Sequence, residues 1–214
     1  MRRIRILLLG GRMPSNGDFR GLAAEAGYDV MRETVTGCEA LDFIEKHRPE
    51  AVILNIEPDS AGMEIAMSVK RRLPSVAVVL ITDRYDEERL LAALKGGANA
   101  CLSKEVTPEE LLDTVRKAVQ GEYPITQTIL QPAVASRIIA EFANGSRSTR
   151  ETAHPPARLL PLEAEILWHI SNGGSLEQVT REMHISEDTV KQRLYTILGK
   201  LVANSRNCSL ADAG

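Results

Sequence analysis

The sequence lacks the features that would mark a membrane protein, a disulfide-bonded scaffold or a common enzyme. Its apolar N-terminal run ends at Gly11, far short of the roughly 20 residues that span a membrane, and predicts a strand rather than a signal peptide. Cys38, Cys101 and Cys208 show no CxxC or metal-ligand spacing, so we expect reduced thiols in a cytoplasmic protein. The motifs GxxxxGK[ST], HExxH and GxSxG are missing, and we predict no metal, cofactor or enzymatic activity. The formal net charge of -3 gives no general attraction to nucleic acid.

The first half of the chain contains apolar, strand-like runs that alternate with helical patterns. Strands are predicted at 4–9, 29–33, 51–55, 77–82 and 100–102, and helices at 19–26, 39–46, 63–73, 87–95 and 108–120. Five such units predict a parallel sheet covered by helices on both faces. The last helix has a clear start, because Thr107 can cap it, Pro108 fits its first turn and Glu110 completes a capping box.

The pattern changes after residue 122. Residues 131–143 predict one more helix, and 144–157 (NGSRSTRETAHPPA) are polar and rich in Gly, Ser and Pro, which is typical of a flexible linker. From residue 159 only helical periodicity remains. A helix from Pro161 to the NGG at 172–174 is followed by a short helix capped by Ser175 and Gln178, a tight turn at 184–186 and a long helix. Its buried stripe would be Val190, Leu194, Ile197, Leu198 and Leu201. This layout is a helix-turn-helix, and we divide the chain into 1–122, 123–158 and 159–214.

Two stretches carry a resemblance to a known family: GGANACLSKEVTPEELLDTVRKAVQGE (96–122) and ISEDTVKQRLYTILGKL (185–201). Through them the chain resembles the NarL/FixJ class of bacterial response regulators over nearly its whole length. The resemblance implies an α/β receiver-like (flavodoxin-like) domain with a five-stranded parallel sheet, joined by a linker to an all-α helix-turn-helix domain of the LuxR type. It also implies a transcription regulator of a two-component system.

The resemblance further implies a phosphorylation site at the carboxyl ends of the strands, where open α/β sheets bind their ligands. In working receivers an aspartate after the third strand accepts the phosphoryl group, and an acidic pair after the first strand holds magnesium. A Ser or Thr and a Lys bind the phosphoryl oxygens. This chain retains Thr82 and Lys104, but it has Asn55 at the acceptor position, Gly10 and Gly11 at the acidic pair, and Cys101 at the switch aromatic.

These replacements predict a pseudo-receiver that is not phosphorylated. An amide does not attack a phosphoryl donor as a carboxylate does, and glycine offers magnesium no oxygen ligand. Three interpretations stay open: an inert Asn55, a hydrogen-bonded cluster of Asn55, Thr82 and Lys104 that fixes one conformation, or an emptied pocket for a small ligand. We favour the first two together, expect no rescue by Asp18, Glu57 or Asp59, and expect Cys101 to be a small core residue rather than a redox sensor.

In LuxR-type domains the second helix of the motif enters the major groove, and here that helix begins at Glu187 or Asp188. The resemblance places Lys191, Gln192 and Tyr195 at base-facing positions. Lysine can reach guanine acceptors, and glutamine can pair with adenine. Candidates for phosphate contacts, which position the helix without specifying sequence, are Thr189, Ser186, Arg193, Lys200 and Arg206.

The charge of the second domain opposes DNA binding, because seven acidic residues outnumber five basic ones from residue 159 onward. We predict an atypical, orphan-type response regulator that binds DNA independently of aspartyl phosphorylation. The alternative is a non-DNA-binding interaction module that controls a partner protein. Expected partners are promoter DNA with repeated or palindromic half-sites, a second copy in a homodimer, and a kinase or the transcription machinery, but no membrane.

Overall fold

The computed structural model describes residues 4–10, 19–33, 38–56, 61–83, 86–145 and 156–211. The chain forms two compact units: residues 1–89 with 98–124, and residues 90–97 with 125–214. Ten residues of the expected linker, 146–155, lie outside the described part. No described helix has the length and apolar character needed to cross a membrane.

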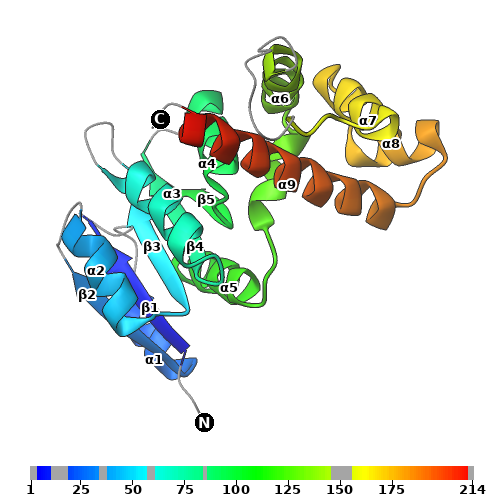
Figure 1. Cartoon of the computed structure of the whole chain (residues 1–214). Coiled ribbons are helices and arrows are strands. Elements are labelled where there is room, and N and C mark those ends of the chain that lie inside the picture. Colours follow the sequence, from blue (N-terminus) through cyan, green and yellow to red (C-terminus); the bar gives the residue numbers. More distant parts are fainter. Residues whose placement is uncertain are drawn as a thin grey trace. The chain divides into compact units, whose positions relative to one another are not determined.

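The first unit is built on the predicted five-stranded parallel sheet (Figure 1). Its strands are β1 (Ile4–Leu9), β2 (Tyr28–Glu33), β3 (Ala51–Asn55), β4 (Ala77–Thr82) and β5 (Ala100–Ser103), in the order β2-β1-β3-β4-β5. All six residues of β4 are buried, as are the first four of β3. The sequences of these two strands are continuous apolar runs, because a central parallel strand is covered by helices on both faces.

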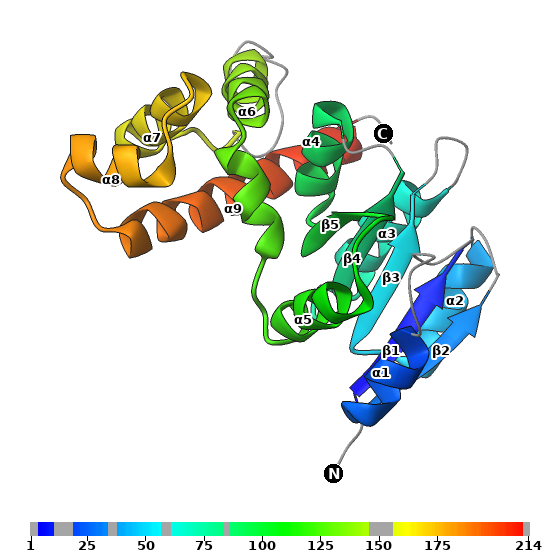
Figure 2. The same cartoon turned by 180° about the vertical axis from the view of Figure 1, so that it is seen from behind.

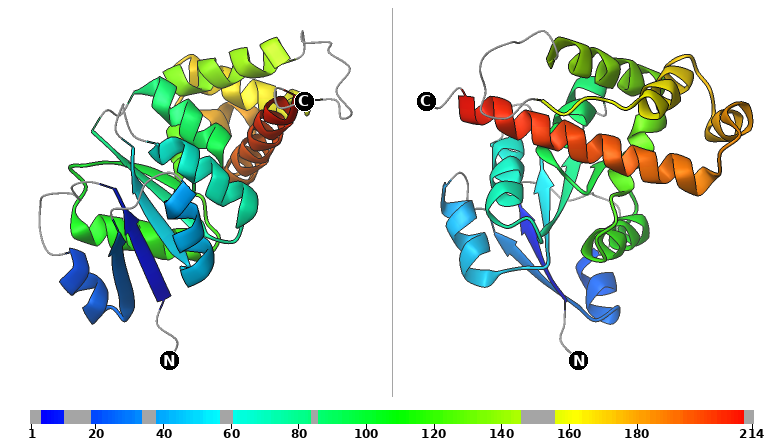
Figure 3. Two further views of the ribbon diagram at one scale, coloured as in Figure 1. Left: turned by 60° about the vertical axis from the view of Figure 1, so that its left-hand side comes forward. Right: turned by 45° about the vertical axis from the view of Figure 1, so that its right-hand side comes forward.

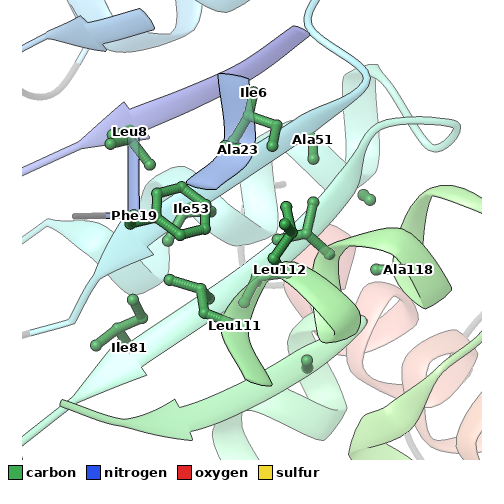
Figure 4. Packing of buried hydrophobic residues seen from close by; sticks show 14 of the residues in the cluster. Ile6, Leu8, Phe19, Ala23, Ala51, Ile53, Ile81, Leu111, Leu112 and Ala118 are labelled. Atoms are coloured by element: carbon green, nitrogen blue, oxygen red, sulfur yellow. The ribbon is translucent and has the colours of Figure 1, made fainter. Parts of the chain in front are cut away.

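The helices that follow the strands are α1 (Phe19–Glu25), α2 (Cys38–His47), α3 (Gly62–Arg72), α4 (Glu87–Gly96) and α5 (Pro108–Val119). Helices α1 and α5 pack together on one face of the sheet, and α2 and α3 lie on the other (Figure 2). Figure 4 shows the first of these layers, in which Phe19 and Leu111 cover Ile53 on β3. The predicted capping box of α5 is present, since the Thr107 hydroxyl accepts from the Glu110 N–H and the Glu110 carboxylate accepts from the Thr107 N–H.

A buried lysine makes hydrogen bonds next to the amino-terminal ends of β4 and β5. Lys70 on α3 is 4% exposed, and its Nζ donates to the carbonyl oxygens of Pro74 and Val76 at 3.2 and 3.1 Å and to Asn99 Oδ1 at 3.2 Å. Asn99, also buried, donates from Nδ2 to the carbonyl of Glu122. The lysine is thus held by oxygen acceptors from the loop after α3 and the start of β5, which offsets the cost of burying a cation.

The described residues of the second unit form helices joined by loops. It contains a 3-10 helix, η1 (Pro124–Leu130), which the sequence did not predict, followed by α6 (Pro132–Gly145), α7 (Pro161–Ser171), α8 (Leu176–Met183) and α9 (Glu187–Ala211). Ser175 and Gln178 form the expected capping box of α8. His184 adopts a left-handed conformation with φ of +54°, which turns the chain between α8 and α9.

Helix α9 is a single helix of 25 residues and is clearest in the right-hand view of Figure 3. Its predicted apolar stripe is buried, with Val190, Leu194, Ile197, Leu198 and Leu201 at most 4% exposed. The core of this unit is completed by residues of the two preceding helices: Ile166, Leu167, Ile170 and Val179. The stripe fixes which face of α9 points inward, so the opposite face is left for solvent or a ligand.

Candidate functional site

The first candidate site is the carboxyl edge of the sheet. The strand register pairs Asn55 with Ile81 and Thr82 with Ser103, so Asn55 and Thr82 end neighbouring strands. Gly10 follows β1 with φ of +81°, and a Cβ built on it would lie 3.7 Å from the Cβ of Asn55. The N–H of Lys104 donates to the Thr82 carbonyl at 2.9 Å. The structure therefore brings four of the predicted positions to one edge, while Gly11, Asp18, Glu57 and Asp59 lie outside the described residues.

An arginine that was not among the predicted site residues, Arg89, also lies at this edge of the sheet. The Arg89 guanidinium donates to the Thr82 hydroxyl at 3.1 Å and to the Ile56 carbonyl at 3.4 Å. Carboxylates of Asp83 and Asp86 lie 3.6 and 3.7 Å from its nitrogen atoms. Thr82 is fully buried and the Arg89 side chain is only one-fifth exposed, so the cation is held in place from several directions.

This position of Arg89 has an electrostatic consequence. The hydroxyl of Thr82 accepts a charge-assisted hydrogen bond from a permanently protonated group, which is stronger than a neutral one. The guanidinium links the end of β3, the end of β4 and the first turn of α4. A fixed cation therefore lies at the edge of the sheet where Asn55, Gly10 and Thr82 meet.

Cys101 lies on β5, 3% exposed. Burial raises the pKa of its thiol to about 12, with a smaller lowering by the charge of Arg89. The thiol therefore stays protonated at neutral pH and packs as a small apolar group. Among the described residues, no group of three His, Cys, Asp or Glu side chains is arranged to hold a metal ion.

The second candidate site is the N-terminal part of α9. Ser186 precedes the helix, and its hydroxyl accepts from the Thr189 N–H at 3.1 Å while contacting the Thr189 hydroxyl at 2.8 Å. Lys191 and Gln192 are exposed, and Tyr195 is 41% exposed. These three side chains share the face opposite the buried Val190 and Leu194, so the structure brings all the predicted base-facing positions together.

Within this face, Lys191 is paired with an acidic neighbour. Its ammonium lies 2.7 Å from the carboxylate of Glu187, one helical turn earlier. The hydrogen bond that the Lys191 ammonium donates to Glu187 raises the pKa of Lys191 above its ordinary value, so the lysine is fully charged at neutral pH. Both side chains are slightly more than half exposed, which leaves the pair accessible to a ligand.

The residues predicted to contact DNA phosphates differ in their exposure and in their partners. Thr189 and Ser186 lie at the start of α9, Arg193 is half-buried and Arg206 is exposed. Lys200, by contrast, lies 2.6 Å from the carboxylate of Glu163, a residue of α7 with no exposed surface. In the free protein Lys200 therefore joins α9 to α7.

Comparison with known proteins agrees with this arrangement. The family described as the response regulator receiver domain matches residues 18–116, and the family described as bacterial regulatory proteins, luxR family, matches residues 158–211. Two curated relatives come from Bacillus subtilis (strain 168), and both are described as uncharacterized transcriptional regulatory proteins. YhcZ is 29% identical, over 86% of this chain and 82% of its own. YxjL is 27% identical, over 99% of this chain and 95% of its own.

A solved response regulator from Thermotoga maritima shares the fold of part of the chain. The match covers 56% of this chain and 99% of the Thermotoga maritima chain, with a TM-score of 0.50 and 14% sequence identity. The sheet, the helix-turn-helix and the two family matches together identify the chain: it belongs to the response regulators that join a receiver domain to a LuxR-family helix-turn-helix, and it is a homologue of the NarL/FixJ type.

Proposed function

We propose that this response regulator binds promoter DNA through α9 and regulates transcription without phosphorylation of its receiver domain. The observation that carries the DNA-binding part is the exposed face of Lys191, Gln192 and Tyr195 on a capped helix whose other face is buried. A helix fits the major groove of DNA, and these side chains supply donors and acceptors for base edges.

The independence from phosphorylation is supported by the carboxyl edge of the sheet. Asn55 ends β3 with an amide in place of a nucleophilic carboxylate, and Gly10 has no side-chain oxygen to offer a metal ion. Arg89 already supplies a charged donor to the Thr82 hydroxyl. We infer that the domain keeps one conformation, in which Arg89 holds the hydroxyl that a phosphoryl group engages in working receivers.

The alternative is an interaction module that does not bind DNA. Two observations favour it. The acidic residues Glu187 and Asp188 are exposed on the first turn of α9, and the single tryptophan, Trp168, is 58% exposed on α7. Carboxylates repel the phosphate backbone, and an exposed tryptophan is common at protein interfaces.

As a DNA-binding protein it would act in the cytoplasm, as a homodimer on repeated or palindromic half-sites. Its input would be protein level, a partner such as a kinase or the transcription machinery, or a ligand. We expect no enzymatic activity from it.

A selection from random DNA with the full-length protein, made without any phosphodonor, tests the DNA-binding part. We expect a shared half-site whose affinity falls steeply with salt, and a weaker, less selective complex for Lys191→Ala. No enrichment, even at low salt, would favour the interaction module.

Intact mass after incubation with acetyl phosphate and magnesium tests the receiver part. The protein should keep its mass and its oligomeric state. A stable phosphoryl adduct on the wild-type chain would overturn the pseudo-receiver.

A further inference from the structure

The acidic residue beside Lys191 is part of the exposed face of α9. Glu187 lies one turn before Lys191, and its Oε1 is 2.7 Å from the lysine Nζ. The backbone positions of the two residues are fixed, because Ser186 caps the helix and Val190, between them in the sequence, is buried. A donor and an acceptor are thus held side by side at the position where α9 would meet base edges.

The major-groove edge of a G·C base pair presents the complementary pattern. Guanine offers two adjacent acceptors, N7 and O6, and cytosine offers the N4 donor beside them. Guanine O6 and cytosine N4 are hydrogen-bonded to each other and therefore lie about 2.9 Å apart. The 2.7 Å spacing of the Glu187 and Lys191 atoms matches that distance.

We propose that Glu187 is a specificity-determining residue that reads one G·C base pair together with Lys191. The Lys191 ammonium donates to guanine O6 and N7, and the Glu187 carboxylate accepts from cytosine N4. The inference rests on the proposed DNA-binding function and names the base pair to which that site binds.

The other base pairs fit this pair of side chains less well. An A·T pair places the adenine N6 donor between two separated acceptors and adds the thymine methyl group, so the ammonium reaches only one acceptor at a time. A C·G pair presents the same groups in reversed order along the edge. The order of Glu187 and Lys191 along α9 therefore sets the preferred orientation as well as the preferred pair.

The pairing also explains how an acidic side chain can be accommodated against DNA. The two opposite charges of Glu187 and Lys191 leave the pair with no net charge, so it adds nothing to the neutralisation of phosphates. Its contribution appears in base preference, whereas the salt dependence of binding comes from the other cationic residues of the unit.

The test is a selection from random DNA with the full-length wild type, Glu187→Ala and Glu177→Ala. Glu177 is the matched control, since it forms an equivalent pair with Arg181 on α8, also one turn apart, and its removal changes the net charge equally. We expect a wild-type half-site with one position dominated by G·C. The Glu187→Ala variant should lose most of the discrimination there, which we expect to be about 5- to 150-fold, and Glu177→Ala should keep it.

The outcomes separate the inference from the function on which it rests. A wild-type motif that Glu187→Ala leaves unchanged at every position would overturn the inference alone. Equally tighter binding to all sequences by both variants would show a general charge effect and would overturn it as well. If the wild type enriches no motif, the proposed DNA-binding function fails, and the inference fails with it.

Discussion

Replacing Lys200 with methionine removes the cation from a buried carboxylate. Glu163 has no exposed surface, and its Oε2 accepts from the Leu160 N–H at 2.8 Å and from the Lys200 ammonium at 2.6 Å. Its Oε1 is buried and has no hydrogen-bond partner within the described residues. Removing one member of a buried ion pair costs about 3–5 kcal/mol. Because the Lys200 side chain is 19% exposed, water can partly replace it, and we expect the lower end, about 3 kcal/mol.

Urea unfolding of the full chain, followed by tryptophan fluorescence, measures this loss. Trp168 is the only tryptophan of the sequence and lies on α7 with Glu163, so its signal reports the unit that the mutation affects. The matched control is Lys191→Met, which breaks an exposed pair and should leave the unfolding midpoint almost unchanged. Glu163→Gln combined with Lys200→Met should recover much of the stability, because no unpaired charge remains.

The sequence suggested a different role for Lys200, as a contact to DNA phosphate. In that case Lys200→Met would reduce the slope of the logarithm of the DNA-binding constant against the logarithm of the salt concentration by about one, and would leave stability nearly unchanged. A midpoint equal to that of the wild type, together with such a change in slope, would refute the reasoning from the buried pair.

Three further predictions concern the receiver domain. Burial raises the pKa of Cys101 to about 12, so the folded protein should resist alkylation of this residue at pH 8. The protonated Cys101 thiol should contribute its full stabilisation of the fold below about pH 8.5, and this stabilisation should be lost as the pH rises toward 12. Peptide mapping after iodoacetamide treatment measures this, and modification as fast as in urea would contradict it. Lys70→Met should lower the free energy of unfolding by about 2–3 kcal/mol, because Asn99 and two carbonyl oxygens lose a charged donor. An unchanged urea midpoint by circular dichroism would argue against that network. Asn55→Asp should gain no phosphoryl group from acetyl phosphate and magnesium, since Gly10 still supplies no carboxylate to hold the metal ion. A phosphoryl adduct in its intact mass would contradict this.

The elements that the sequence predicts well are those with a strong local signal. The apolar runs at 51–55 and 77–82 became β3 and β4 with the same bounds, because nearly every side chain in them is buried. The start of α5 at Pro108 follows from its cap, which depends only on residues three apart. Helix η1 was not predicted, since seven residues without helical spacing give no periodic signal.

The groups that the sequence left undetected are pairs formed across the fold. Arg89 reaches Thr82 from the helix after the β4–α4 loop, and a basic residue near such a helix start has many other possible positions. Lys200 and Glu163 are 37 residues apart, and nothing in either segment shows that the other is its partner. The pairing of Glu187 with Lys191, in contrast, could have been found from their spacing of four residues on a predicted helix.

The central claim is that this response regulator binds DNA without being phosphorylated. The most direct measurement is the dissociation constant of the full-length protein for its selected fragment at fixed salt, before and after incubation with acetyl phosphate and magnesium. The account predicts tight, salt-sensitive binding that is the same in both samples. Binding that strengthens only after the phosphodonor is added, together with a phosphoryl adduct in the mass spectrum, would contradict it.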